Sequence, residues 1–312
     1  MKRNHYAIHS DFKRWKRANL PINRPFIALA QLFEGRMFAR EKSTEELSVE
    51  QKLLAVGGKS VPALLYSPEG IKENAPCLIV YHGGGFVFPA APYHYTLARE
   101  YALRAGCKVL FVKYRLAPKY PFPAGVEDCF AAYQYATENA AEWGIDEKRI
   151  AVSGDSAGGC LAAAVCLIAK EQGLKLPCGQ MLLYPAVGAN LETESMKKYV
   201  DTPMCNSRDV QKFSRLYLPK GEVDKKLYPY LSPLEAKEFK DLPRAYIETA
   251  EFDCLRDGAI LFAEKLKKDG VEVELNDTVG TMHAFDIETE SPIVRGCVEK
   301  RIAFLKKCFR GK

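Results

Sequence analysis

The sequence has no hydrophobic run long enough to span a membrane and no apolar segment behind its basic N-terminus. Its longest apolar stretch is Cys160–Ala169. That is well short of the roughly 18 residues that a transmembrane helix needs, so we interpret it as a buried helix. The first residues, Met1–Tyr6, are basic but lack the h-region of a secretory signal. We therefore expect neither a signal peptide nor stable insertion into a membrane.

Closely spaced cysteine pairs are missing as well. None of the 10 cysteines belongs to a C-x-x-C motif, which excludes zinc-ribbon and thioredoxin-like sites. Most lie inside apolar segments, as Cys77, Cys107, Cys160 and Cys166 do, where a free thiol behaves as a small hydrophobic side chain. Reduced cysteines are typical of the cytoplasm, and the sequence predicts that location.

The chain also lacks a large excess of charge of one sign, and the small excess it has is diffuse. The chain has 45 Lys and Arg residues against 39 Asp and Glu residues, a net charge of +6. It contains no long Lys/Arg block and no RNA-binding motif, so nucleic acid is not an expected partner.

Two short glycine-rich motifs stand out instead, His82–Phe86 (HGGGF) and Gly154–Gly158 (GDSAG). The second fits G-x-S-x-G, a strained strand-to-helix turn that presents a nucleophilic serine. The first fits a loop whose backbone N–H groups receive a tetrahedral oxyanion. It lacks the lysine and spacing of a P-loop and is not G-x-G-x-x-G. Together the two motifs predict a serine hydrolase with Ser156 as its nucleophile.

Histidine is scarce, and this scarcity identifies the candidate base. Of five histidines, only His283 follows Ser156. Behind a nucleophile elbow the acid and then the histidine come later in the chain. We therefore expect His283 to remove the proton of Ser156.

Three carboxylates are candidates for the acid that orients the histidine. Glu251, Asp253 and Asp257 follow the strand expected at Arg244–Thr249. Asp253 is favoured because it lies in the loop just beyond that strand. Asp257 is expected to cap the helix that begins at Gly258, and Glu251 to brace the loop.

The oxyanion is expected to accept hydrogen bonds from three backbone N–H groups, those of Gly83, Gly84 and Ala157. Glycine allows the backbone to approach a substrate closely. Three neighbouring residues are expected to support the loops rather than the chemistry, namely His82, Gly85 and Asp155.

Strand-like and helix-like segments alternate along most of the chain. Strands are expected at residues 52–56, 61–66, 77–81, 108–112, 150–153, 180–184, 244–249 and 271–275, and helices at 126–141, 157–171, 258–268 and 294–309. This order predicts an α/β fold with a largely parallel sheet covered on both faces. Ligands of such sheets bind beyond the carboxyl ends of the strands, where both motifs fall.

Two segments interrupt the alternation. Residues 1–45 carry two helical patterns, the first of them basic through Lys13, Arg14, Lys16 and Arg17. A basic amphipathic helix could lie on a membrane surface, but a cap helix packed over the body is the favoured interpretation. Residues 186–243 look like an insertion over the sheet. We expect N-terminal cap helices at 1–45 and a catalytic domain at 46–312, with 186–243 as a second cap segment.

At these residues the chain resembles the hormone-sensitive-lipase-like group of α/β-hydrolases, which includes bacterial carboxylesterases and arylacetamide deacetylases. The resemblance spans roughly residues 60–310 and rests on the segments 82–86, 114–118, 154–158, 184–185, 232–234, 253–257 and 283–285. It implies a central eight-stranded sheet and a helical cap built from the N-terminal helices and an insertion before the acid.

Three positions depart from the pattern of that group. Lys113 and Lys119 stand where it usually has Asp and Glu, so a supporting ion pair is expected to be lost or reversed. Cys254 replaces the usual proline after the acid, which is expected to make that loop less rigid.

The leading hypothesis is a serine carboxylesterase that acts through an acyl-enzyme, without a metal or organic cofactor, and the family resemblance implies that it hydrolyses short-chain acyl esters. Five aromatic residues near the motifs are candidates for an acyl pocket: Phe86, Phe88, Tyr93, Tyr184 and Phe285. The expected partner is a small-molecule ester, and a homodimer is an open expectation. The alternatives are an amidase or deacetylase of acylated small molecules and, less favoured because all three triad residues are present, a non-catalytic ligand receptor.

Overall fold

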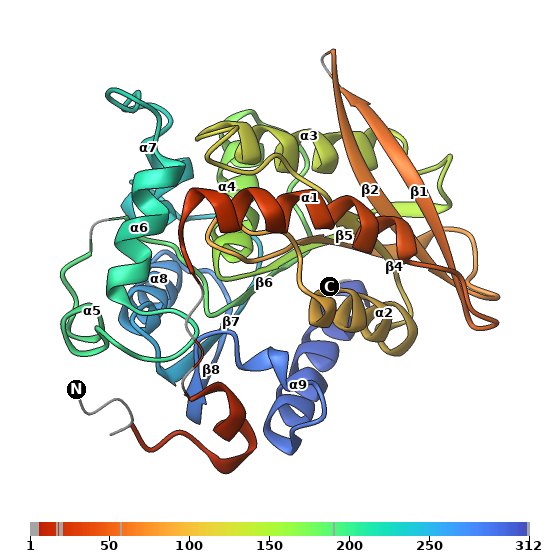
Figure 1. Cartoon of the computed structure of the whole chain (residues 1–312). Coiled ribbons are helices and arrows are strands. Elements are labelled where there is room, and N and C mark those ends of the chain that lie inside the picture. The colour runs from red at the N-terminus through yellow and green to blue at the C-terminus, as the bar shows by residue number, and fades with distance from the viewer. Residues whose placement is uncertain (1–5, 17, 19–20, 57, 190, 311–312) are drawn as a thin grey trace.

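The computed structural model describes residues 6–16, 18, 21–56, 58–189 and 191–310. An eight-stranded sheet runs through the molecule in the order β1-β2-β4-β3-β5-β6-β7-β8 (Figure 1). The strands are β1 Leu47–Val56, β2 Lys59–Pro68, β3 Ala75–Tyr81, β4 Lys108–Val112, β5 Ile145–Asp155, β6 Gln180–Leu183, β7 Ala245–Phe252 and β8 Val273–Met282. β2 is antiparallel to both β1 and β4, and the remaining pairs are parallel. The predicted mostly parallel eight-stranded sheet is thus confirmed.

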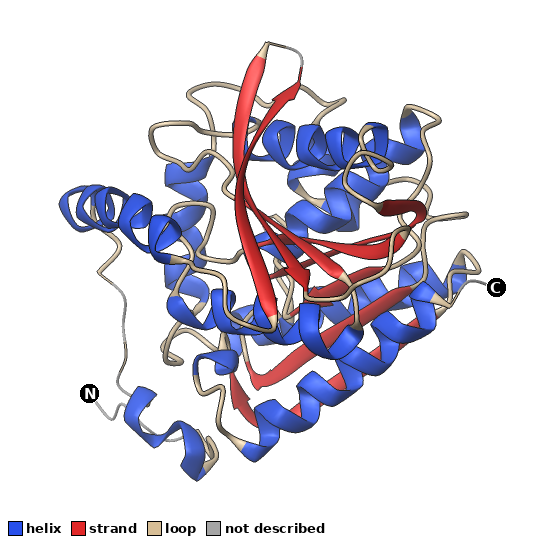
Figure 2. Ribbon diagram, turned by 90° about the vertical axis from the view of Figure 1, so that its right-hand side faces the viewer, coloured by secondary structure: helices blue, strands red, loops and turns tan. Residues whose placement is uncertain are grey.

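Helices cover both faces of the twisted sheet (Figure 2). The longer ones are α1 Arg24–Arg40, α2 Pro92–Ala105, α3 Ala124–Glu138, α4 Ala157–Glu171, α6 Ser207–Tyr217, α8 Arg256–Lys268 and α9 Pro292–Phe309. Short helices are η1 Ser10–Trp15, α5 Glu194–Lys198, α7 Tyr228–Leu231, η2 Pro233–Glu235 and η3 Phe285–Ile287.

Two buried clusters form the core, one on each face of the sheet. In β3, Ile79 and Tyr81 belong to the cluster that includes α3, α4 and α8, whereas Leu78 and Val80 belong to the cluster that includes α2 and α9. This alternation follows from the period of two in a strand. Because helices cover both faces of the sheet, the central strands consist of nearly continuous runs of apolar residues.

The apolar stretch Cys160–Ala169 lies within α4, as the sequence predicts. Nearly all of this helix is buried against β5, β6 and α3. Its sequence consists largely of small and aliphatic residues, which allow close packing on several sides. The helix therefore holds the residue before it, Ser156, on a rigid support.

The structure extends several predicted elements and adds others, among them α2 and the helices of residues 186–243. β8 continues to Met282 rather than ending at 275, so His283 follows the strand directly. Helix α2 was not predicted, because apolar residues occupy most of its positions and obscure the helical period. Its end signals are present nevertheless, with Pro92 in the first turn and Gly106 in the left-handed conformation at φ 65°.

Helices α1 and α6 lie toward the end of the sheet at which both motifs are found (Figure 1). The N-terminal segment contacts the insertion, since the Tyr6 hydroxyl donates to Asp201 at 2.7 Å and the Met204 N–H to the Ala18 carbonyl at 3.1 Å. Arg17, part of the expected basic face, lies outside the described residues. The domain boundaries themselves stay a prediction.

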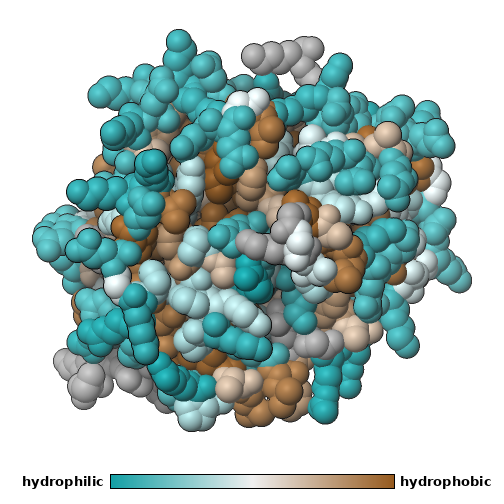
Figure 3. All heavy atoms as spheres, turned by 90° about the horizontal axis from the view of Figure 1, so that it is seen from above, coloured by the Kyte–Doolittle hydropathy of each residue, from teal (hydrophilic) through white to brown (hydrophobic). Residues whose placement is uncertain are grey.

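Seen from above, the molecule has a mostly hydrophilic rim, and hydrophobic side chains reach the surface in several separate patches (Figure 3). Scattered apolar surface of this kind is normal for a folded protein. Within the ranges described, no helix is both long and apolar enough to cross a bilayer.

Candidate active site

Ser156 sits on a sharp turn between β5 and α4. Its backbone has φ 54° and ψ −117°, a conformation that costs energy for a residue with a side chain. A Cβ atom on Gly158 would overlap the Tyr81 carbonyl, and one on Gly154 would overlap the backbone of Gly158. The glycines of G-x-S-x-G are therefore required by close packing, and the turn lifts the serine hydroxyl out of the sheet.

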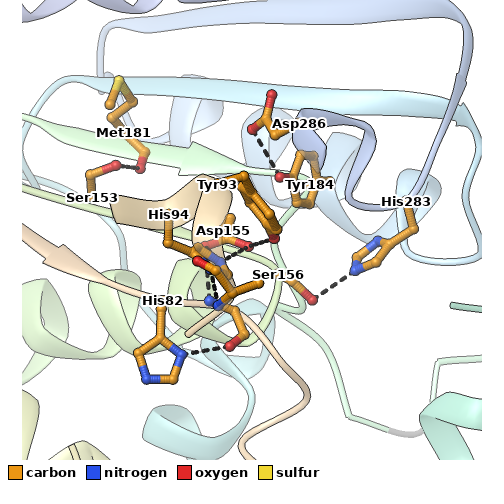
Figure 4. A network of polar contacts seen from close by, with 12 residues as sticks. His82, Tyr93, His94, Ser153, Asp155, Ser156, Met181, Tyr184, His283 and Asp286 are labelled. Atoms are coloured by element: carbon orange, nitrogen blue, oxygen red, sulfur yellow. Dashed lines mark hydrogen bonds and ion pairs between the residues drawn. The ribbon is translucent and has the colours of Figure 1, made fainter. Parts of the chain in front are cut away.

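The structure brings together Ser156, His283 and Asp253 from the ends of three strands. Ser156 Oγ lies 2.8 Å from His283 Nε2 (Figure 4), and His283 Nδ1 lies 2.7 Å from Asp253 Oδ2. The relative exposures are 8%, 4% and 0%. The second oxygen of Asp253 accepts the Leu255 N–H at 2.9 Å, which fixes the carboxylate. The nucleophile, the base and the orienting acid thus form a hydrogen-bonded triad.

The environment of His283 favours its charged form. Burial alone would lower the pKa of the imidazole, but the Asp253 carboxylate, the nearby Cys205 sulfur and the Asp253 hydrogen bond raise it to about 9. Because a carboxylate accepts at Nδ1, that nitrogen carries the proton in the neutral ring and Nε2 is left to accept from the serine. The site can therefore stabilise an imidazolium once the serine has lost its proton.

The assignment of Gly83 as an oxyanion donor is wrong. Its N–H donates to Asp155 Oδ1 at 2.8 Å in a buried contact. By contrast, no described residue accepts the N–H of Gly84, Gly85 or Ala157. These three groups are the donors that the geometry leaves for an oxyanion, and Gly85 replaces Gly83 in the set.

Asp155 supports the oxyanion loop, as expected. Besides the Gly83 N–H, its carboxylate accepts the Tyr93 hydroxyl at 3.2 Å and His94 Nε2–H at 3.1 Å (Figure 4). Burial acts to raise the pKa of Asp155, but His94 and the hydrogen bonds lower it below its usual value. The group therefore stays ionised and holds the loop electrostatically.

His82 also plays the structural part that the sequence predicts. Its Nδ1–H donates to the Gly83 carbonyl at 2.7 Å, and its ring stacks on Tyr114 at a centroid distance of 4.5 Å. Burial, followed by the neighbouring His94, lowers the pKa of His82 to about 4. A neutral ring is therefore packed beneath the glycine loop.

Around the acid, the contacts of the two other carboxylates differ from those expected. The Glu251 carboxylate of β7 accepts the Gly280 N–H at 2.7 Å, which ties β7 to the end of β8 just before His283. Asp257 does not cap α8, because the helix already begins at Arg256. Its carboxylate instead accepts the Ser195 N–H at 2.8 Å.

The five aromatic residues do not form one pocket wall. Tyr184 and Phe285 are fully buried, and the Tyr184 ring packs edge-on against His283 at a centroid distance of 5.2 Å. Tyr184 thus supports the histidine, and Phe285 packs edge-on against Tyr184. Tyr93 is also buried, and Phe86 stacks on Tyr217.

Sequence reasoning missed Phe213 of α6. A Cβ on Gly85 would lie 2.5 Å from the Phe213 ring, which also packs edge-on against Phe88. A residue of the insertion therefore lies directly over the oxyanion loop. A lone phenylalanine in the polar stretch SRDVQKFSRLY was the available signal.

The three departures from the family pattern leave the loops intact. Arg115 binds Asp128 through two nitrogens at 2.8 Å, so an ion pair still anchors residues 114–118. Lys119 lies over the Tyr120 ring. Cys254 is buried, and its carbonyl accepts the Ser195 hydroxyl at 2.9 Å. Among the residues with described positions, no group of three or more His, Cys, Asp or Glu could hold a metal ion.

An elbow serine bonded to a histidine and a carboxylate, beside a loop of unpaired N–H groups, defines a hydrolase-type site. Residues 78–287 match the model of a protein family described as "alpha/beta hydrolase fold", and the chain belongs to this family. Within it, the chain is a member of the hormone-sensitive-lipase-like group.

Similar proteins carry esterase names. The carboxylesterase NlhH of Mycobacterium tuberculosis is 37% identical over 243 residues, covering 77% of this chain and 76% of the relative. The ethyl acetate hydrolase of Pseudomonas putida is 32% identical over 233 residues, covering 73% and 72%. The crystal structure of a thermostable esterase from Pseudomonas putida ECU1011 superposes with a TM-score of 0.86 at 28% identity, covering 97% and 98%.

Proposed function

We propose that this protein is a serine carboxylesterase that hydrolyses short-chain acyl esters through an acyl-enzyme. Ser156 Oγ attacks the ester carbonyl while His283 Nε2 takes its proton, and Asp253 stabilises the imidazolium. The N–H groups of Gly84, Gly85 and Ala157 receive the negative charge on the carbonyl oxygen. His283 then protonates the departing alcohol, and water repeats the sequence on the acyl-enzyme.

One observation carries the proposal, the hydrogen-bonded line from Ser156 through His283 to Asp253, at 2.8 and 2.7 Å. A ligand receptor would have no need of a histidine bonded to a strained serine, so the geometry disfavours that alternative. The esterase names of the relatives support hydrolysis of esters in particular.

Short acyl chains are favoured by two findings. One relative is an ethyl acetate hydrolase, whose name denotes a small substrate. In this chain, the Phe213 ring lies over Gly85 and restricts the space next to the oxyanion loop.

Hydrolysis of p-nitrophenyl esters from acetate to palmitate tests the proposal. We expect the highest kcat/KM on the short esters and no turnover with Ser156→Ala. Ser153→Ala is a matched control, because Ser153 is a buried serine of β5, the strand that leads to Ser156, and its hydroxyl donates to the Met181 carbonyl at 2.9 Å (Figure 4). A folded wild-type protein inactive on every ester would refute the proposal, and a p-nitroanilide series would then test the amidase alternative.

We propose a cytoplasmic location because the cysteines are reduced. All ten are free thiols, and nine are buried. Fractionation of the native host with an antibody would test this, and recovery of the protein outside the cell would contradict it.

A further inference from the structure

A fully buried ionic cluster lies behind the candidate histidine. Arg301 of α9 has no exposed surface and forms ion pairs with Glu248 and, at 2.9 Å, with Asp286. Its other terminal nitrogen donates to the Tyr101 hydroxyl at 3.2 Å. The Tyr246 hydroxyl also donates to Glu248, at 2.6 Å.

Stability alone is a poor explanation for such a cluster. Removing three charged groups from water is costly, and well-packed apolar residues often stabilise a protein as well or better. Asp286 lies on the same short loop as His283, in η3. The placement therefore points to a role in holding the site.

Tyr184 connects this cluster to the histidine. Its hydroxyl donates to Asp286 Oδ2 at 2.9 Å, while its ring packs edge-on against the His283 ring (Figure 4). Its own backbone is constrained, since it has φ 35° and its N–H donates to the Glu248 carbonyl at 2.6 Å. The Tyr184 ring can shift only if the Asp286 contact breaks.

Tyr93 lies between Tyr184 and the oxyanion loop. Its hydroxyl donates to Asp155, the carboxylate that holds the Gly83 N–H. The side chains of Tyr93 and Tyr184 interact electrostatically, and Figure 4 shows them between Asp155 and Asp286. Buried tyrosines thus lie between the loop of the base and the loop of the oxyanion donors.

We propose that Tyr184 and Tyr93 are positioning residues, which hold the histidine and the oxyanion loop in one rigid frame anchored by Asp286 and Arg301. The inference rests on the proposed function. Misplacing catalytic groups by about 1 Å can cost about 100-fold in rate, so a frame of this kind acts on kcat. Removing one hydroxyl should release both loops in part, because the two side chains pack in the same buried cluster.

The test compares Tyr184→Phe, Tyr93→Phe and the double variant. Each change removes one hydroxyl and keeps the ring. Tyr246→Phe is the matched control, because it removes a buried hydroxyl that donates to Glu248 of β7 and not to a group on either loop of the site. kcat and KM are measured with p-nitrophenyl butyrate and divided by the number of active serines, counted by the p-nitrophenol burst from diethyl p-nitrophenyl phosphate.

We expect each single tyrosine variant to lose about tenfold in kcat with KM changed less than twofold. The double variant should lose little more than the worse single one, because groups that act as a unit are non-additive. Tyr246→Phe should stay within twofold of wild type. Losses that multiply in the double variant, or a kcat within twofold of wild type for both single variants, would overturn the inference.

Asp286 supplies a second measurement. Asp286→Asn keeps an oxygen that can accept the Tyr184 hydroxyl, whereas Asp286→Ala keeps none. The asparagine variant should therefore retain more kcat per active serine than the alanine variant, and equal losses in the two would contradict the frame. If wild type itself hydrolyses no ester, the proposed function fails; if wild type is active but the tyrosine variants match it, only this inference fails.

Discussion

The two sides of the site are held in different ways. The body side consists of the loops that follow the strands of the sheet, and the cap side is the proposed cap with helix α1. On the body side, Ser156, His283 and Asp253 are almost wholly buried and joined by hydrogen bonds. On the cap side, α1 leaves large apolar side chains in solvent, with Leu29 50% and Leu32 74% exposed. The groups that do the chemistry are thus fixed from several directions, whereas part of the cap is only lightly packed.

This difference suggests a division of roles. Rigid, preorganised groups lower the barrier of the chemical step, so changes in the body should act mainly on kcat. We propose that the lightly packed cap contributes little to that step and instead borders the space that a substrate enters. Changes in the cap should therefore act mainly on KM and on the preferred acyl length.

The largest effect is expected from Asp253→Asn. The amide cannot stabilise the imidazolium and favours the wrong tautomer of His283, so kcat should fall by about 10⁴-fold while KM changes little. Steady-state kinetics with p-nitrophenyl butyrate would measure this. A loss below about tenfold would show that another carboxylate orients the histidine.

The next largest effect is expected from Gly84→Ala. Its φ is 113°, and a Cβ would lie 2.6 Å from the Phe88 carbonyl oxygen, so the oxyanion loop must distort. Losing one oxyanion donor costs about 10²- to 10³-fold in kcat. Gly296→Ala is the control, because a Cβ there meets nothing within 4 Å. Equal kcat values for the two variants would contradict the placement of the donors.

The pH dependence should follow His283. Only the neutral imidazole accepts the serine proton, and its pKa is raised to about 9. kcat/KM should therefore rise with pH, about tenfold per unit below that value, and level off above it. In Asp253→Asn the raising influence is gone, so the rise should move to lower pH. A pH profile from 6 to 10 would show this, and an unmoved midpoint would be evidence against the pair.

Sequence patterns predicted the side of the site that holds Ser156, His283 and Asp253 well, because the chemistry there requires particular residue types in a particular order. Ser156 was identified by its glycines, and His283 by being the one histidine that follows it. The sheet was predicted from apolar runs that both faces must bury. These are local or countable signals, and the structure places the residues together accordingly.

The errors concern features that depend on contacts across the fold. Nothing in HGGGF indicates which N–H groups are already bonded, and only the position of Asp155 excludes Gly83. Burial of Tyr184 and Phe285 likewise depends on how the loop after β8 packs. Arg301 gave no signal, since an arginine in an amphipathic helix is normally exposed.

The smallest predicted effect concerns the contact between the two sides. The Gln31 side chain of α1 donates to the Val87 and Ala117 carbonyls, both at 2.8 Å. Gln31→Ala removes both bonds from the cap but touches none of the groups that move protons. We expect a KM raised about threefold on the longer esters, with kcat within twofold, since a hydrogen bond contributes about 1 kcal/mol to stability. Gln51→Ala on the exposed side of β1 is the control. A kcat loss as large as that of Tyr184→Phe would show that α1 belongs to the rigid frame after all and would remove the distinction between the two sides.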